Sequence, residues 1–311
     1  MRILDGPQIA QALDYSELIE RIAAAFRSAA TAPLRHHHAF GDNAGTLLLM
    51  PAWNSQFAGV KIAAVVPGNA ARGLASVQAT YFLLDGATGQ PLAVLEGREL
   101  TLRRTAATSA LASRCLSRPD SARLLLVGAG ALSPHLARAH ARVRPIREIA
   151  VWNRTPARAE TLAETLAAEF AGQGIAVRAA AALAGAVANA DIVSTATLAI
   201  EPILRGAWLA PGQHIDLVGG FRPHMREADD ATLGRASLYC DARAAATKEA
   251  GDLAGPLARG VIAPADIRGD LFDLVRREGP ARDRSDEITL FKSVGHAIED
   301  LAAAVMAFER A

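Results

Sequence analysis

The chain has 311 residues, of which 51% are hydrophobic and 21% are charged, and its formal net charge at pH 7 is +1. A chain of this length can bury large cores, and so balanced a charge gives no electrostatic basis for binding nucleic acid or a membrane surface. The first residues do not follow a signal-peptide pattern, and no apolar run is long enough to span a bilayer. Cys115 and Cys240 lie far apart in apolar surroundings, which predicts buried free thiols in a reducing, cytoplasmic compartment.

The first third of the chain predicts a helix and a small antiparallel sheet. Apolar spacing indicates a helix over residues 16–30, and four short segments follow between Gly, Pro and Asn turns. The predicted strands are residues 46–50, 59–66, 77–85 and 91–96. The turn at residues 85–89, Asp-Gly-Ala-Thr-Gly, is typical of a hairpin between the last two. A helix over residues 100–116 leads through Arg118, Pro119 and Asp120 into the next domain.

From about residue 121 onward, strands alternate with alanine-rich helices, a pattern typical of a doubly wound parallel sheet. The predicted strands are residues 124–127, 148–152, 176–179, 191–196, 214–218, 237–240 and 288–293. We therefore predict an α/β protein with two domains. A Rossmann-type dinucleotide-binding domain spans residues 119–294, and an α+β domain for substrate binding and dimerisation spans residues 1–118, completed by a C-terminal helix over residues 295–311.

A glycine turn after the first strand of the second domain predicts a dinucleotide site. Residues 124–127 are apolar without alternation, as in a strand buried on both faces. Gly128 permits a tight turn, and Gly130 lets a pyrophosphate approach the N-terminus of the following helix. Ser133 stands in place of the third glycine of the usual pattern, and it is small enough for close helix packing. A Gly-x-Gly pair alone is weak evidence, since glycines end many strands.

The end of the second strand predicts which cofactor is bound. An acidic residue there usually accepts hydrogen bonds from a free ribose 2′-hydroxyl, but this chain has Asn153, Arg154 and Thr155. An amide, a guanidinium and a hydroxyl can bind a 2′-phosphate without repelling it, so the residues favour NADP(H), with NAD(H) still possible. Thr155 followed by Pro156 is equally typical of a helix start.

Five motifs together resemble the ornithine cyclodeaminase/mu-crystallin family. They are Leu-Met-Pro at residues 49–51 followed by Gly-Val-Lys at 59–61, Leu-Thr-Leu-Arg-Arg-Thr-Ala-Ala at 100–107, Gly-Ala-Gly at 128–130, Val-Trp-Asn-Arg-Thr at 151–155, and Glu-Ile-Thr-Leu-Phe-Lys-Ser-Val-Gly at 287–295. The resemblance implies a homodimer formed through the N-terminal sheets, with a substrate site between the two domains. Reactions in the family include ornithine cyclodeamination, alanine dehydrogenation and the reduction of cyclic ketimines such as pyrroline-2-carboxylate and piperideine-2-carboxylate.

The resemblance and the fold together predict the cofactor-binding residues. They are Gly128, Ala129, Gly130, Ala131, Leu132, Asn153, Arg154, Thr155, Thr195, Ala196, Thr197, Val218, Gly219, Ser293, Val294 and Gly295.

Hydride transfer to a carbon that bears nitrogen requires the substrate carboxylate to be held in place, and arginine binds carboxylates bidentately. We predict Arg104, with Arg35, for this role; Arg103 is interpreted as a surface arginine. Residues 36–38 are all histidine, but three consecutive side chains do not easily converge on one ion, so no metal site is predicted.

Lys61 is the predicted catalytic residue, because the family's catalytic lysine falls at this position. Burial near Arg104 and Arg35 would lower its pKa and allow proton exchange with the substrate nitrogen or a water. Without the resemblance, a solvated lysine on a strand would be the simpler interpretation.

One departure from the family pattern favours reduction over cyclodeamination. Ornithine cyclodeaminases have an acidic residue directly after the glycine turn that here is Gly219-Gly220, and this chain has Phe221. A phenyl ring cannot accept a proton, and Asp216, earlier on the strand, is a poor substitute. The predicted function is therefore NAD(P)H-dependent reduction of a small cyclic imine carboxylate. Ornithine cyclodeamination, alanine dehydrogenation and non-catalytic binding of a small ligand remain alternatives.

Overall fold

The structure is a computed structural model, and it describes residues 1–42, 45–220, 222–279 and 281–311. The chain divides into two compact units, one of Met1–Ala107 with Gly295–Ala311 and one of Thr108–Val294. The first boundary lies inside helix α3 (Gly97–Leu116) and not after residue 118, because this continuous helix contributes residues to both units. In the described part of the chain, no helix combines the length and apolar character needed to cross a membrane.

Unit 1 is built on one six-stranded sheet, in the order β1-β6-β5-β4-β3-β2. Its strands are β1 (Arg2–Leu4), β2 (His36–Phe40), β3 (Gly45–Trp53), β4 (Phe57–Val65), β5 (Val77–Asp85) and β6 (Pro91–Glu96). β1 runs parallel to β6, and the other pairs are antiparallel. The two strands that sequence reasoning missed are β1, which has three residues, and β2, whose residues are all exposed.

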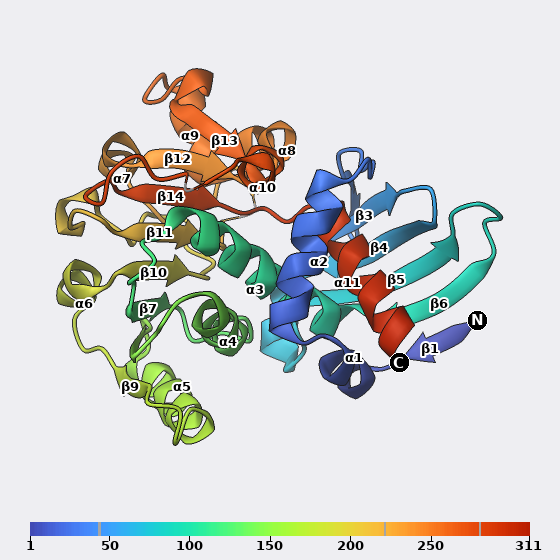
Figure 1. Ribbon diagram of the computed structural model, residues 1–311, viewed down its shortest axis with the longest axis horizontal. Helices are drawn as coiled ribbons and strands as arrows, with labels where there is room; N and C mark the ends of the chain where they lie inside the picture. The colour runs from blue at the N-terminus through green and yellow to red at the C-terminus, as the bar shows by residue number, and fades with distance from the viewer. Residues whose placement is uncertain (43–44, 221, 280) are drawn as a thin grey trace. The chain divides into compact units, whose positions relative to one another are not determined.

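Three helices of unit 1 are α1 (Gly6–Ala12), α2 (Tyr15–Arg27) and α11 (Ala297–Arg310), and a 3₁₀ turn η1 spans Pro67–Arg72. Asp14 begins α2 by accepting hydrogen bonds from the Ser16 and Glu17 N–H groups. Leu18, Ile22 and Phe26 then recur at helical spacing and are fully buried. Helix α11 packs beside α2 and against β3, β4 and β5, so these two helices cover one face of the sheet (Figure 1).

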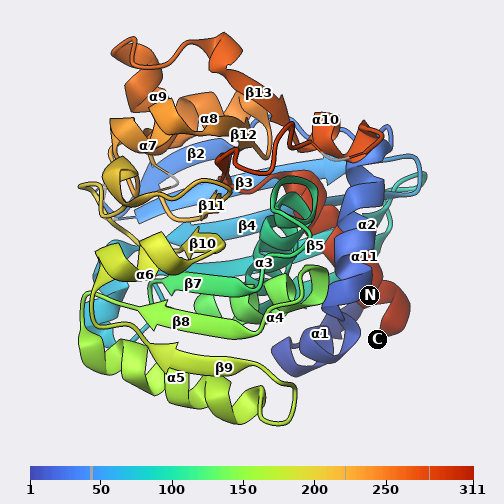
Figure 2. The ribbon, with the colours of Figure 1, turned by 60° about the vertical axis from the view of Figure 1, so that its left-hand side comes forward.

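Unit 2 is built on an eight-stranded parallel sheet, in the order β13-β12-β14-β11-β10-β7-β8-β9. Its strands are β7 (Arg123–Val127), β8 (Glu148–Trp152), β9 (Ala176–Ala179), β10 (Ile192–Thr195), β11 (His214–Leu217), β12 (Ser237–Cys240), β13 (Ile267–Asp270) and β14 (Thr289–Lys292). The chain moves outward from β7 to β9 and then returns to β10 on the other side of β7 (Figure 2). This reversal is the switch point of a doubly wound sheet, where such folds bind dinucleotides. The predicted fold class is confirmed, and β13 is the strand that was not predicted.

The connections of unit 2 are mostly helical. They are α4 (Ser133–Val143), α5 (Pro156–Glu169), α6 (Leu183–Asn189), η2 (Gly206–Trp208), α7 (Asp230–Arg235), α8 (Arg243–Glu249), α9 (Gly251–Ala258), η3 (Pro264–Asp266) and α10 (Leu271–Arg276). The core lies between these helices and the sheet, and it includes Leu125, Val193, Ile215 and Leu290, each from a different strand. A core of this kind fixes the carboxyl ends of the strands, which carry the predicted cofactor residues.

Candidate active site

Lys61 is buried although it is a charged residue on a strand. Side chains alternate along β4, and this alternation places Gly59, Lys61 and Ala63 on the face that the helices cover. Lys61 is only 3% exposed, and its Nζ donates a hydrogen bond to Oδ1 of Asp300 at 2.9 Å. Asp300 lies in the first turn of α11. A buried lysine is therefore balanced by a carboxylate from the other end of the chain.

Arg104 lies in the same cluster and is 5% exposed. Its Nη1 lies 2.5 Å from Oε2 of Glu299, and its Nε lies 2.8 Å from Oδ1 of Asp300. Gly295 makes room for this guanidinium, because a Cβ at that position would lie 2.7 Å from Nη1. Gly295 was predicted as a cofactor residue, and what the structure shows is close packing against Arg104.

The charges of the cluster shift the pKa values of both Lys61 and Asp300. Burial, with the nearby positive charge of Arg104, lowers the pKa of Lys61 from 10.5 to about 8, although Asp300 opposes the shift. Burial alone would raise the pKa of Asp300, but the positive charges of Arg104 and Lys61 outweigh it and hold that pKa below its usual value. The cluster therefore pairs a carboxylate that stays ionised with a lysine that can release its proton near neutral pH.

Arg35 joins the cluster from the segment before β2. Its Nη2 donates to the backbone oxygen of Gly295 at 2.7 Å, and its positive charge lowers the pKa of Lys61 further. The three predicted substrate-binding residues, Lys61, Arg104 and Arg35, are thus brought together in unit 1. The three histidines that follow Arg35 lie on β2, which pairs with β3, and side chains along a strand point alternately to its two faces. His36 and His38 therefore stack, with ring centroids 6.4 Å apart, and His37 lies on the opposite face.

Tyr81 is the cross-strand partner of Lys61 on β5 and is fully buried. Its hydroxyl has no hydrogen-bond partner among the described residues, and neither does Oδ2 of Asp300. A Cβ at position 59 would overlap the Tyr81 hydroxyl, so Gly59 leaves the space that this ring occupies. Burial and the charge of Asp300 raise the pKa of Tyr81, which keeps the hydroxyl protonated and able to donate.

A cavity of about 280 Å³ lies at the switch point of unit 2. It is lined by Gly128, Ala129, Gly130, Trp152, Asn153, Arg154, Arg158, Ala196, Thr197, Leu198, Ala199 and Ile203. Seven of the predicted cofactor residues line it: Gly128, Ala129, Gly130, Asn153, Arg154, Ala196 and Thr197. The other predicted positions in unit 2, Ala131, Leu132, Thr155, Thr195, Val218, Gly219, Ser293 and Val294, do not line this cavity.

The glycine turn has the geometry that a dinucleotide requires. Gly128 has a φ of +115°, and a Cβ there would lie 2.7 Å from the Ala196 backbone oxygen. Gly130 is exposed and has open space where a side chain would stand, so a phosphate can approach the backbone. Ser133 begins α4 and donates from Oγ to the Gly128 backbone oxygen at 2.7 Å. The serine in the third glycine position therefore fixes the turn.

The segment from the end of β8 to the first turn of α5 presents one amide and two arginines. Oδ1 of Asn153 accepts a hydrogen bond from the Ala129 N–H at 3.3 Å. This bond links the segment after β8 to the glycine turn after β7. Arg154 is exposed at the cavity, and Arg158 joins it from the first turn of α5. Thr155 occupies the position before α5 but makes no capping hydrogen bond through its side chain. Two guanidinium groups and no carboxylate line this part of the cavity.

Asp216 and Phe221 were the two residues that the sequence analysis used to weigh cyclodeamination. Asp216 is fully buried on β11 and accepts hydrogen bonds from Ser194 at 2.6 Å and Ser109 at 3.0 Å, so it is a structural residue of the core. Phe221 lies outside the described residues.

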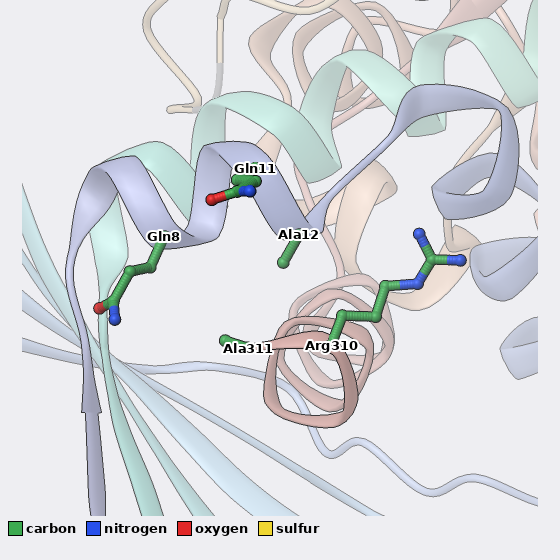
Figure 3. Close-up of a pocket in the computed structure, with 5 residues that line it drawn as sticks. All are labelled: Gln8, Gln11, Ala12, Arg310 and Ala311. Carbon is green, nitrogen blue, oxygen red and sulfur yellow. The ribbon is translucent and has the colours of Figure 1, made fainter.

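A second cavity, of about 550 Å³, lies in unit 1 at the end of α11. Figure 3 shows its lining, with Gln8 and Gln11 on α1 and with Arg310 and Ala311 at the chain end. Its lining includes neither Lys61 nor Arg104, so this cavity is separate from the cluster of buried charges.

Glu299, Asp300 and Arg158 are site residues that sequence reasoning missed. The two acids follow His296 in the pattern of a helix start, and Glu299 does accept from the His296 N–H as part of a capping box. Arg158 has the sequence signature of an ordinary exposed helical arginine. Its position one turn after Arg154 and two residues after a proline at the helix start was the signal available.

Comparison with known proteins agrees with the fold. The sequence profile of the ornithine cyclodeaminase/mu-crystallin family matches residues 3–311, so the chain belongs to this family. It is 42% identical to a Delta(1)-pyrroline-2-carboxylate reductase of Paracoccus denitrificans, over 85% of this chain and 83% of that protein. It is 35% identical to the mouse ketimine reductase mu-crystallin, over 89% of this chain and 84% of that one.

A solved structure matches the whole chain. The Delta(1)-pyrroline-2-carboxylate reductase of Thermococcus litoralis, in complex with NADH and L-proline, superposes with a TM-score of 0.95 and is 34% identical. The match covers 100% of this chain and 97% of that protein.

Proposed function

We propose that the protein is an NAD(P)H-dependent reductase of small cyclic imine carboxylates of the pyrroline-2-carboxylate or piperideine-2-carboxylate type. The observation that carries the proposal is the cluster of the buried Lys61 and Arg104 with the half-buried Arg35, in a chain whose second unit has a cavity at its switch point. Relatives named as reductases of this substrate class are similar along most or all of their length.

The cluster supplies what the imine requires from the protein. When bound, the reduced nicotinamide supplies the hydride that adds to the carbon of the C=N bond. The imine nitrogen then needs a proton, and the ammonium of Lys61, with a pKa of about 8, can donate it. Asp300 holds Nζ at 2.9 Å and stabilises the charged form before transfer.

The charge of the cluster fits a substrate with one carboxylate. Lys61, Arg104 and Arg35 carry three positive charges, and Glu299 and Asp300 carry two negative charges, which leaves one net positive charge in a buried region. A single carboxylate neutralises it, whereas a second carboxylate would be desolvated without a partner. Arg104 is held rigidly by two acids, so we assign it, with Arg35, to orient the substrate carboxylate.

We propose NADPH as the preferred cofactor, with NADH as the weaker one. Arg154 and Arg158 line the adenosine side of the cavity, and Asn153 replaces the acidic residue that would select NADH.

We propose further that the protein is a cytoplasmic homodimer that associates through unit 1. The face of its sheet opposite α2 and α11 carries half-buried apolar side chains, among them Leu49, Ile62, Phe82 and Val94. An apolar sheet face of this extent is typical of an interface between protein chains. Light scattering should give twice the mass of the chain, 32.6 kDa, and Ile62→Asp should shift the protein to a monomer. A wild-type monomer at micromolar concentration would refute the dimer.

The test of function is a substrate panel with both reduced cofactors. Pyrroline-2-carboxylate and piperideine-2-carboxylate should be reduced, with NADPH consumption matched by formation of proline or pipecolate. Pyruvate with ammonia tests alanine dehydrogenation, and ornithine with NAD⁺ tests cyclodeamination. Release of ammonia from ornithine as fast as imine reduction would overturn the proposal.

A further inference from the structure

A second buried ionic cluster lies in unit 2, at the carboxyl ends of the strands beyond the switch point. Lys292 ends β14, and its Nζ donates to the backbone oxygen of Gly219, after β11, and to Oδ2 of Asp252 at 2.9 Å. Lys292, Asp252 and Glu227 are each 0% exposed. None of them belongs to the cluster around Lys61 or to the residues that line the cavity.

The cluster continues from Asp252 to the loop after β10. Oδ1 of Asp252 accepts from the backbone N–H groups of Glu227 at 2.8 Å and Ala228 at 3.1 Å. Oε1 of Glu227 then accepts from the N–H of Thr197 at 2.7 Å and from its Oγ1 at 2.8 Å. One unbroken chain of hydrogen bonds therefore ties the ends of β10, β11 and β14 together.

Two glycines let these segments pack closely. A Cβ at position 219 would overlap the backbone oxygen of Thr197 and contact Oε1 of Glu227, and a Cβ at position 220 would lie 2.8 Å from Oδ2 of Asp252. Gly220 also has a φ of +60°, which side-chain-bearing residues rarely adopt. The network thus fixes the backbone at Gly219 and Thr197 with little freedom to move.

Burying the ionic side chains of this network costs desolvation free energy. Replacing a buried ion pair by apolar residues of similar volume is often neutral or stabilising, so stability alone does not account for three buried charged groups. Oε2 of Glu227 has no hydrogen-bond partner among the described residues, and burial, with the charge of Asp252, raises its pKa. What the network does fix is the position of Thr197, which lines the cavity, and of Gly219.

We propose that Lys292, Asp252 and Glu227 are positioning residues that set the binding site for the nicotinamide half of the cofactor. A doubly wound fold binds the two halves of a dinucleotide on opposite sides of its switch point. Gly128, Gly130 and Arg154 belong to the β7–β8 side, and the network belongs to the β10–β11–β14 side. The inference rests on the cofactor assignment of the proposed function.

The test separates the two halves of the cofactor by using two probes. Binding of NADPH is measured by fluorescence titration, and binding of 2′,5′-ADP, which lacks the nicotinamide half, is measured by calorimetry. For Lys292→Met and Glu227→Met, the Kd of NADPH should rise at least tenfold and the Kd of 2′,5′-ADP should change less than twofold. Arg154→Ala should weaken both probes.

Asp191→Asn is the matched control, because it disrupts a charged network at the opposite, amino ends of the strands of the same sheet. In the wild type, Asp191 pairs with Arg118 and Arg123. The Asp191→Asn variant should therefore have a lower thermal stability, with both Kd values unchanged. Lys292→Met leaves Asp252 buried without its partner, so Glu227→Met, which removes a buried carboxylate, provides the test if the lysine variant does not fold.

The outcomes are distinct. A rise in the Kd of NADPH alone supports the inference. Equal changes for both probes, or lower stability with both Kd values unchanged, would overturn it and leave a purely structural network. Failure of the wild-type protein to bind either NADPH or NADH would overturn the proposed function and this inference with it, whereas unchanged NADPH binding in both variants overturns the inference only.

Discussion

Lys61 and Lys292 are both buried, and each lies 2.9 Å from one aspartate, but their surroundings differ. Lys61 shares its aspartate with Arg104 and has Arg35 nearby, so positive charge is in excess. Lys292 shares its environment with a backbone oxygen and two acidic side chains. The comparison teaches that a buried lysine among cations is suited to proton transfer, whereas one among acceptors is suited to hold neighbouring loops in place.

Removing Lys61 is the largest expected effect, and it should change catalysis without changing cofactor binding. Lys61→Ala should lower kcat for pyrroline-2-carboxylate reduction by about 10² to 10⁴, because general acid assistance is lost. The Kd of NADPH should stay within about twofold, since the cofactor cavity is in unit 2. Lys248, which is exposed on α8, gives the control variant Lys248→Ala. A Lys61 variant that keeps wild-type kcat would remove this residue from the mechanism.

Replacing Arg154 should produce the converse pattern in unit 2. Arg154→Ala should weaken NADPH binding by about 1.5–3 kcal/mol, which is roughly ten- to hundredfold, because a hydrogen bond to a charged phosphate is lost. NADH binding and kcat should change little, and Arg158→Ala should act in the same direction. Arg142→Ala, at an exposed position on α4, is the control. If both cofactors lose affinity equally, Arg154 does not bind the 2′-phosphate.

The pH dependence of the reaction sharpens the assignment of Lys61. The ammonium form donates the proton, so kcat/KM for imine reduction should be level below pH 8 and fall as pH rises through about 8, by about tenfold per pH unit at the limit. Oxidation of the cyclic amine in the reverse direction requires the neutral form and should rise over the same interval. Lys61→Ala should lose this inflection in both directions, and an inflection that persists in the variant belongs to another group.

The last expected effect concerns stability at the amino ends of the unit 2 strands, where Asp191 precedes β10. Burial would raise the pKa of Asp191, but hydrogen bonds from Arg123 and from the Ala122 and Arg123 N–H groups outweigh it and lower that pKa from 3.8 to about 2. A carboxylate with a depressed pKa stabilises the fold above its unfolded value, and this stability is lost as pH falls from about 4 to about 2. Asp191→Asn should cost about 1.5–3 kcal/mol at pH 7.

Urea unfolding of the wild type and of Asp191→Asn between pH 7 and pH 2 measures this effect. The difference between their midpoints should shrink below pH 4. A constant difference would show that the carboxylate charge is not what stabilises this edge.

The fold was largely predictable because its signals are local. The strands β5 and β6 have the bounds that the surrounding turns indicated, and β7 coincides with the apolar run at residues 124–127. β2 was missed because its run of histidines shows no burial pattern. β1 is too short for any periodicity to register.

The site was only partly predictable because its decisive pairs are distant in sequence. Lys61, Arg104 and Gly128 stand in recognisable motifs. Asp300 does not, because the start of α11 has the ordinary signature of a capped helix, and only its packing against β4 brings the acid to Lys61. The Lys292 network was missed for the same reason, since each of its acids follows a different strand.

The return of α11 to the first sheet also sets an order of events during synthesis. Lys61 is made early, but its partner Asp300 is 239 residues later, so a ribosome must translate the whole of unit 2 before the lysine can be neutralised. Unit 2 is continuous in sequence and can fold as it emerges, whereas unit 1 must wait for the last helix with its lysine and arginine still hydrated. The Lys61–Asp300 pair thus cannot form until α11 has been synthesised, and a chain cut short before α11 keeps the continuous unit 2 but lacks the acid that pairs with Lys61.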